Sequence, residues 1–297
     1  MEMRKAMRGR AVRQAALAPA LLLCLTGSLR AGIQSADLWL LQADGTPARA
    51  LTTHDSSDEE PEFSPDGRRV LFDSNRAGSN DLYVLDLDSG DLTRLTSEPA
   101  KEDHGAWSPD GEWIAFQHDA GHNTDVWLMR ADGTDRRRLT TNAARDGWPD
   151  WSPDAEWIVF SSDRSGNREV FIMRPDGTQQ RQLTHSRSDN TDPSWSPDGT
   201  LIAFNSERDG NSEIYVMRPD GSGQTRMTQS PDMFEERPAW TPDGSYLIFS
   251  QFGPEWRGLA RLDLSTGQVE RLPEIDGHFF IRPDVAPSGE WVVAERR

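Results

Sequence analysis

Six histidines are the first side chains in this sequence that could do chemistry: His54, His104, His118, His122, His185 and His278. Three of them, His104, His118 and His122, lie close together in sequence, with Asp103 and Asp119 beside them. Imidazole nitrogens and a carboxylate oxygen are ligands that a divalent metal ion accepts. These three histidines are therefore the candidate ligands for a divalent metal, and no other cofactor is expected.

A second candidate set stands four residues before a short motif that returns six times. The motif reads S-P-D-G, or a close variant, and begins at Ser64, Ser108, Ser152, Ser196, Thr241 and Ala286. The residue four positions earlier is, in order, Glu60, His104, Trp148, Asp192, Arg237 and Arg282. Such a set could form a ligand-binding ring, or its acids and arginines could pair with one another as a structural feature.

Signatures of a dedicated active site are absent from the sequence. It contains no G-x-S-x-G elbow, no phosphate-binding loop and no H-E-x-x-H helix. Its only cysteine is Cys24, so a cysteine nucleophile could come only from the N-terminal segment. Binding is therefore favoured over catalysis.

The repeats indicate the elements that position these residues. Successive motifs are 44 or 45 residues apart, and each lies between two apolar runs, as in a strand, a tight turn and a second strand. Pro presets the first turn dihedral, Asp tolerates the second and Gly allows a positive φ, so the motif aspartates are interpreted as turn formers. Two further short strands follow in each repeat. Four antiparallel strands per repeat predict an all-β fold, a six-bladed β-propeller.

The order of strands at the two ends predicts how the ring closes. The chain enters the repeats with the third and fourth strands of a blade, residues 37–52, and ends with the first and second strands of another, residues 284–297. Pairing these halves completes a sixth blade and removes an open sheet edge that would favour aggregation.

Two more repeated positions have structural interpretations. The large residue before each motif, such as Trp151 or Trp195, is expected to pack between neighbouring blades. Arginines at 76, 164 and 208 precede an acid by five residues, so each arginine is expected to form an ion pair across its hairpin, with Asp81, Glu169 and Glu213 respectively.

The N-terminal segment differs from the repeats in composition and predicts where the protein is located. Five basic residues precede an apolar run from Ala15 to Leu25, and small residues follow, as in a secretory signal peptide. We assign residues 1–36 to a cleaved signal peptide and residues 37–297 to one propeller, with a periplasmic or secreted location. No later run is long enough to insert in a membrane.

The net charge of the repeat region limits the kinds of partner that it can bind. Residues 37–297 hold 26 basic and 48 acidic side chains, a net charge of −22. Phosphates would be repelled, so nucleic acid is excluded as a partner. Many of the acids, Glu59, Glu60, Asp192 and Glu236 among them, stand just before the first strand of a blade. A basic or cationic partner is therefore expected at that end of the channel.

The repeat as a whole resembles a known family. Trp followed by S-P-D-G, then S-x-R-x-G-N-x-E-I-Y-V-M-x-x-D-G and R-x-L-T, is similar to the TolB-type, WD-repeat-like propellers, and the resemblance covers Asp37 to Arg297. TolB itself carries an α/β domain before its propeller, for which this sequence has no room. The resemblance implies a role in the cell envelope by analogy with the Tol–Pal system.

Two functions follow from these observations. The first is a non-enzymatic, monomeric module that binds a protein or envelope component through the residues at the channel mouth. The alternative is a metal-dependent enzyme, similar to propeller polysaccharide lyases, that uses histidines at the mouth.

Overall fold

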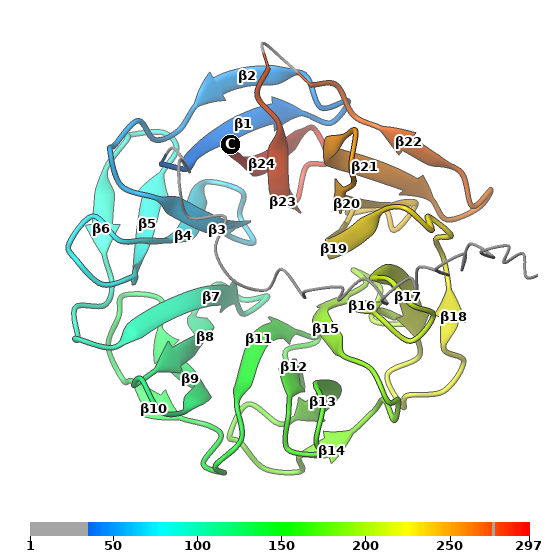
Figure 1. The fold of residues 1–297 in the computed structure, drawn as a ribbon. Helices are drawn as coiled ribbons and strands as arrows, with labels where there is room; N and C mark the ends of the chain where they lie inside the picture. Colours follow the sequence, from blue (N-terminus) through cyan, green and yellow to red (C-terminus); the bar gives the residue numbers. More distant parts are fainter. Residues whose placement is uncertain (1–34, 275–276) are drawn as a thin grey trace, which may run out of the picture. The chain divides into compact units, whose positions relative to one another are not determined.

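The computed structural model describes residues 35–274 and 277–297, and every regular element in these ranges is a β-strand. The strands form six sheets of four strands each, set around a central channel (Figure 1). The predicted six-bladed β-propeller is thereby confirmed. No helix in the described ranges is long and apolar enough to cross a membrane. The predicted signal peptide, residues 1–36, lies outside them except for its last two residues.

Five of the blades are continuous in sequence, each running from an inner strand beside the channel to a short outer strand. Their strands are, for blade 1, β3 (Asp58–Phe63), β4 (Arg69–Ser74), β5 (Asp81–Asp86) and β6 (Leu92–Arg94); for blade 2, β7 (Lys101–Trp107), β8 (Trp113–Asp119), β9 (Thr124–Arg130) and β10 (Arg137–Arg138); for blade 3, β11 (Asp146–Trp151), β12 (Ile158–Ser162), β13 (Glu169–Met173) and β14 (Arg181–Gln182); for blade 4, β15 (Asn190–Trp195), β16 (Ile202–Ser206), β17 (Glu213–Met217) and β18 (Thr225–Arg226); and for blade 5, β19 (Phe234–Trp240), β20 (Tyr246–Phe252), β21 (Arg257–Asp263) and β22 (Val269–Arg271).

The sixth blade combines the two ends of the repeat region. Its sheet has the order β2-β1-β24-β23, in which β1 (Asp37–Gln42) and β2 (Pro47–Ala50) join β23 (Phe280–Val285) and β24 (Trp291–Arg296). Strands β1 and β24 pair antiparallel without a break, from Asp37 opposite Arg296 to Gln42 opposite Trp291. This pairing confirms the predicted closure of the ring by N- and C-terminal strands.

The S-P-D-G motif forms the turn between the inner two strands of each blade. In blade 1, the Ser64 hydroxyl donates to Asp66 Oδ1 at 2.5 Å, and Asp66 Oδ1 also accepts the Arg68 backbone N–H at 3.1 Å. Gly67 has φ +67°, which glycine adopts without strain. The Ser64 hydrogen bond lowers the pKa of Asp66, so this aspartate is ionised within its own turn. The same serine–aspartate bond recurs at Asp110, Asp154 and Asp198.

The large residue before each turn belongs to the core between blades. Trp151 is buried against Ala106 and Leu128 of blade 2 and against Ile158 of its own blade, and its indole N–H donates to the Ala106 carbonyl at 3.2 Å. Trp195 is likewise buried, against Val159 of blade 3. The predicted packing role of these two tryptophans is confirmed. The blades are therefore held together by apolar side chains that lie directly behind the channel wall.

Candidate functional site: the central channel

One residue in each inner strand adopts the left-handed conformation and lines the channel. These six residues, which we call the mouth ring, are those expected from the repeat alignment, and their φ values run from 49° to 59°: Glu60, His104, Trp148, Asp192, Arg237 and Arg282. Each lies at a β-bulge, where the register with the second strand slips by one residue. A left-handed non-glycine residue costs about 1 to 2 kcal/mol, and the bulge that holds it recurs at this position in every blade.

The cavity enclosed by the inner strands has a volume of about 490 Å³. It is lined by the mouth ring, by the residues next to it in each inner strand, and by the prolines of the S-P-D-G turns. A space of this size can take a small molecule or one or two side chains of a partner.

The charged members of the mouth ring neutralise one another. Arg237 pairs with Glu60 and, through Nε at 3.2 Å, with Asp192. Arg282 Nε lies 3.2 Å from Glu60, and its Nη1 lies 2.9 Å from Glu295. Burial alone would raise the pKa of Glu60, but Arg237 and Arg282 lower it below its usual value. The acids and arginines of the mouth ring are thus paired with one another, as the structural alternative expects. A ligand that binds them would have to compete with these ion pairs.

The remaining two mouth residues pack against these ion pairs. Arg237 Nη2 donates to His104 Nε2 at 3.1 Å, and His104 Nδ1 lies 3.1 Å from Asp103 Oδ1. The ring of His104 meets the ring of Trp148 edge-on at 5.4 Å. On blade 3, the Arg168 guanidinium covers the same indole at 4.7 Å. Both rings are therefore fixed in place before any ligand arrives.

A second ring, two residues further along each inner strand, is one that the sequence analysis missed. We call it the waist, and it reads Glu62, Ala106, Asp150, Ser194, Ala239 and Asp284. Its three carboxylates each accept the backbone N–H of the core aromatic in the next blade, from Trp107 to Glu62 at 2.9 Å, from Trp195 to Asp150 at 2.6 Å and from Phe63 to Asp284 at 2.7 Å. Reading the repeat alignment at this position as well would have found them.

The waist carboxylates have no cation beside them. Within the described residues, no lysine, arginine or histidine contributes to their pKa values. Burial raises the pKa of Asp150 to about 6, and burial together with the charge of Asp150 raises the pKa of Asp284 to about 7. Burial and the neighbouring Asp284 and Asp150 raise the pKa of Glu62 as well. The waist is thus the part of the channel that would gain most from a cationic group.

The expected acidic face around the mouth is largely absent, because most of its acids are buried and paired. Asp58, Glu102 and Asp146 are fully buried at the starts of inner strands, and each accepts from an arginine guanidinium. The expected hairpin ion pairs are accordingly wrong. The loop arginines at 76, 164 and 208 turn inward to Asp58, Asp146 and Asn190, all at 2.8 Å, rather than to Asp81, Glu169 and Glu213. Each guanidinium stacks on aromatic rings of the second and third strands, as Arg76 does on Phe72 and Tyr83, and this position directs it to the inner strand.

The structure separates His104 from the other two histidines that were expected to share a metal ion, whereas His118 and His122 line one hollow in blade 2. His104 faces the channel, whereas His118 lies against the Trp127 ring at 4.7 Å and contacts Glu102 at 3.2 Å. His122 is exposed at the edge of the hollow in blade 2 that His118 also lines. In the part of the chain that the structure describes, the ligand atoms close enough to share an ion come from His118 with two glutamates, without His104 or His122.

Comparison with known proteins places these features in a family. A family model described as "TolB beta propeller domain" matches residues 24–146, 99–179 and 149–297, which is most of the chain. Among curated protein sequences, no relative is found.

Solved structures share the fold. A TolB candidate from Agrobacterium tumefaciens superposes with a TM-score of 0.79 at 24% identity, over 89% of this chain and 99% of that one. TolB from Acinetobacter baumannii gives 0.67 at 17% identity, over 89% of this chain and 64% of that one. An oligogalacturonate lyase from Vibrio parahaemolyticus gives 0.55 at 15% identity, over 88% and 97%. At these identities the likeness extends to the fold alone.

Proposed function

The chain belongs to the TolB β-propeller domain family, and from this premise we propose that it is a non-enzymatic binding protein that holds a protein or envelope component in its channel. A periplasmic or secreted location follows from the predicted signal peptide, and the protein acts as a monomer. The observation that carries the proposal is the pair of rings in the channel, a mouth ring of fixed, self-paired side chains above a waist of carboxylates without counter-ions.

The waist defines the chemistry of the partner. Three carboxyl groups line a cavity of about 490 Å³, which is large enough for a side chain. Each of them already accepts a backbone N–H from the next blade. A lysine or arginine side chain from a partner would supply the missing positive charge. At the mouth, the same partner would exchange contacts with Glu60, Asp192, Arg237 and Arg282, while His104 and Trp148 offer ring surfaces. We therefore propose a partner that presents a basic side chain on a protruding segment.

The test removes one waist charge without removing its backbone contact. In Glu62→Gln, the side-chain oxygen still accepts the Trp107 N–H, and the amide replaces the oxygen that faces the channel. The purified protein would be used to capture partners from an envelope extract of its own organism, and the affinity of the captured partner would be measured. We expect roughly a tenfold loss of affinity, equivalent to about 1.4 kcal/mol, and a weaker dependence on salt.

A matched control lies on the opposite face. Asp176→Asn makes the same acid-to-amide change at an exposed turn, and the amide oxygen can still accept the Thr178 N–H. This variant should bind as the wild type does. The melting temperature of Glu62→Gln, measured beside that of the wild type, separates loss of binding from loss of folding. Equal affinity of both variants would contradict a channel site.

The alternative, a metal-dependent lyase-like enzyme, rested on histidines gathered at the mouth. His104 is the one member of the predicted trio that lines the channel; Arg237 donates to its Nε2, and its Nδ1 lies 3.1 Å from Asp103 Oδ1. The likeness to an oligogalacturonate lyase is one of fold. Binding is accordingly the function we favour.

A further inference from the structure

A buried polar site recurs at the start of the inner strand in most blades, away from the channel. In blades 1, 3 and 4 an arginine from the loop after the second strand fills it. Its Nη2 donates to Asp58, Asp146 or Asn190 at 2.8 Å. Its Nε donates to a serine at the end of the second strand, Ser74, Ser162 or Ser206, at 2.8 to 2.9 Å. The guanidinium is thus held from two sides.

Blade 2 departs from this pattern at three positions. His118 replaces the serine, Ala120 replaces the loop arginine, and Glu102 replaces the inner-strand aspartate. The guanidinium comes instead from Arg136, which precedes β10 and donates to Glu102 at 2.7 Å and to Glu98 at 2.9 Å. Since residue 118 is no longer a serine, the buried Nε of Arg136 has no hydrogen-bond partner in the described structure. Arg136 therefore fills the site less completely than the arginines of blades 1, 3 and 4 do.

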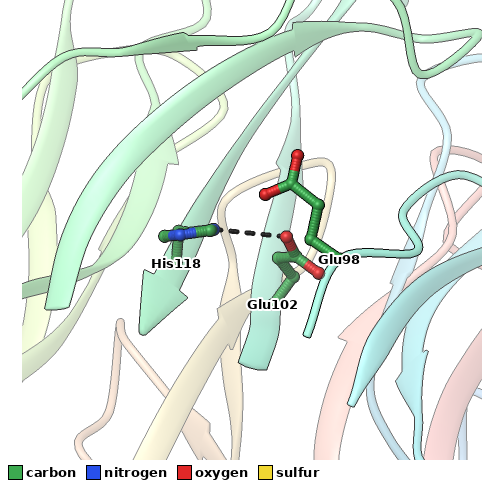
Figure 2. Close-up of side chains that lie close together, drawn as sticks. All are labelled: Glu98, Glu102 and His118. Carbon is green, nitrogen blue, oxygen red and sulfur yellow. Dashed lines mark hydrogen bonds and ion pairs between the residues drawn. The ribbon is translucent and has the colours of Figure 1, made fainter. Parts of the chain in front are cut away.

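Three potential metal ligands converge at this site in blade 2. The imidazole of His118 contacts the carboxylate of Glu102 at 3.2 Å, and Glu98 reaches the same place from the loop between β6 and β7 (Figure 2). One ligand atom from each of the three lies within 4.8 Å of the others. Glu102 is fully buried, and its Oε2 has no hydrogen-bond partner among the described residues. Glu98, with half of its side chain exposed, leaves the site open to solvent.

We propose that Glu98, Glu102 and His118 bind a first-row divalent metal ion, with zinc as the representative, by displacing the guanidinium of Arg136. One imidazole nitrogen and two carboxylate oxygens suit such an ion, with bonds of about 2.0 to 2.2 Å and water at the remaining positions. The tautomer of His118 protonated on Nε2 presents the Nδ1 lone pair to the metal. Metal binding would give Glu102 Oε2, which has no hydrogen-bond partner among the described residues, a ligand contact. It would also let the buried Nε of Arg136 move out and hydrogen-bond to water.

The charges in the site also favour a divalent ion. Blade 1 balances one carboxylate, Asp58, with one guanidinium, Arg76. Blade 2 sets two carboxylates against the single guanidinium of Arg136, which leaves one negative charge in excess. A divalent cation neutralises both glutamates. The site lies apart from the channel lining, so it is independent of the proposed partner binding.

Substitutions that copy the residues of the other blades provide the test. The full-length mature protein, stripped with a chelator, would be titrated with zinc chloride in a calorimeter. The wild type should bind one equivalent. His118→Ser installs the serine found at this position in blades 1, 3 and 4 and should weaken binding by about tenfold or more, as should Glu98→Gln. His122→Ser, at the nearby exposed histidine, should bind as the wild type does.

Arg136→Gln separates a metal site from a purely structural ion pair. Gln180 and Gln224 occupy the corresponding position in blades 3 and 4, so the fold accepts glutamine there. Removing the competing guanidinium should tighten zinc binding at least severalfold. The proposal is overturned if neither the wild type nor Arg136→Gln binds zinc, if His118→Ser binds as tightly as the wild type, or if Arg136→Gln weakens binding. Melting temperatures of all variants, measured without metal, show that each one is folded.

Discussion

The mouth ring and the waist lie two residues apart on the same strands, yet they handle charge in opposite ways. At the mouth, Glu60 lies between Arg237 and Arg282, and its pKa is lowered despite burial. At the waist, Glu62 accepts the Trp107 backbone N–H, and burial together with the nearby Asp284 and Asp150 raises its pKa. The same residue type thus serves as one half of an ion pair in one ring and, in the other, as a buried carboxyl group whose charged form is disfavoured.

This difference suggests separate roles: the ion pairs of the mouth ring stabilise the fold, whereas the waist can gain from a bound cation. An ion-pair network already satisfied within the protein gains little from a further charge, because each partner would have to be released first. An uncompensated carboxylate in a cavity gains directly from any cation that reaches it. In the binding role that we propose, the waist would supply the attraction for a basic partner, and the mouth would be the already paired entrance through which it reaches the waist.

The largest expected effect is at the mouth. Glu60→Gln leaves the guanidinium groups of Arg237 and Arg282 without their shared carboxylate, in a place where all three side chains are mostly buried. We expect a loss of roughly 3 to 5 kcal/mol in the free energy of unfolding, measured by urea denaturation. The control, Asp88→Asn, breaks the exposed pair with Arg68 and should cost less than about 1 kcal/mol. Equal losses in the two variants would show that the mouth network contributes no stability.

A smaller effect is expected at the waist, and it depends on pH. Asp150 has a pKa of about 6 in the folded protein, against the ordinary value of 3.8 in the unfolded chain. As the pH rises from about 4 to about 6, the unfolded chain loses this proton first, so the free energy of unfolding falls, and above pH 6 the loss is complete. Between pH 4.5 and pH 7.5 the contribution of Asp150 is about 2 kcal/mol.

Asp150→Ser isolates this contribution, because Ser194 occupies the corresponding waist position in blade 4. Urea denaturation at both pH values should show a decline in the wild type that is about 2 kcal/mol larger than in the variant. The lost hydrogen bonds to the Trp151 and Trp195 N–H groups affect the variant equally at both pH values. Parallel declines would mean that Asp150 is ionised in the folded protein at pH 4.5.

The fold and the mouth ring could be predicted from the sequence because both are properties of the repeat. A motif returning every 44 or 45 residues sets the blades, and one aligned position, from Glu60 to Arg282, sets a ring. The left-handed conformation of that position was not predicted, since a β-bulge depends on the register between two strands, and sequence alone does not give this register.

Contacts between side chains were predicted less well. Arg76 was paired with Asp81 because the two are five residues apart, but the guanidinium stacks over Phe72 and Tyr83, which directs it to Asp58. His104 and His118 are close in sequence, yet one lies on the inner strand at the channel and the other on the second strand away from it. The waist was missed because Asp150 and Asp284 alternate with alanine and serine, and this irregular set does not stand out from the repeat.

The most direct measurement of the contrast between the two rings is a titration of the channel carboxyl groups, followed by NMR of protein labelled with carbon-13 at aspartate and glutamate side chains. The account predicts that Asp150 titrates near pH 6 and Asp284 near pH 7, whereas Glu59, which pairs with Arg282 and Arg297 at the mouth, stays ionised down to about pH 2. Burial opposes the low value of Glu59, and the two arginines outweigh it. If Asp150 and Asp284 instead titrate near pH 4, their ionised forms are already stabilised within the folded protein, and the proposed gain from a basic partner is contradicted.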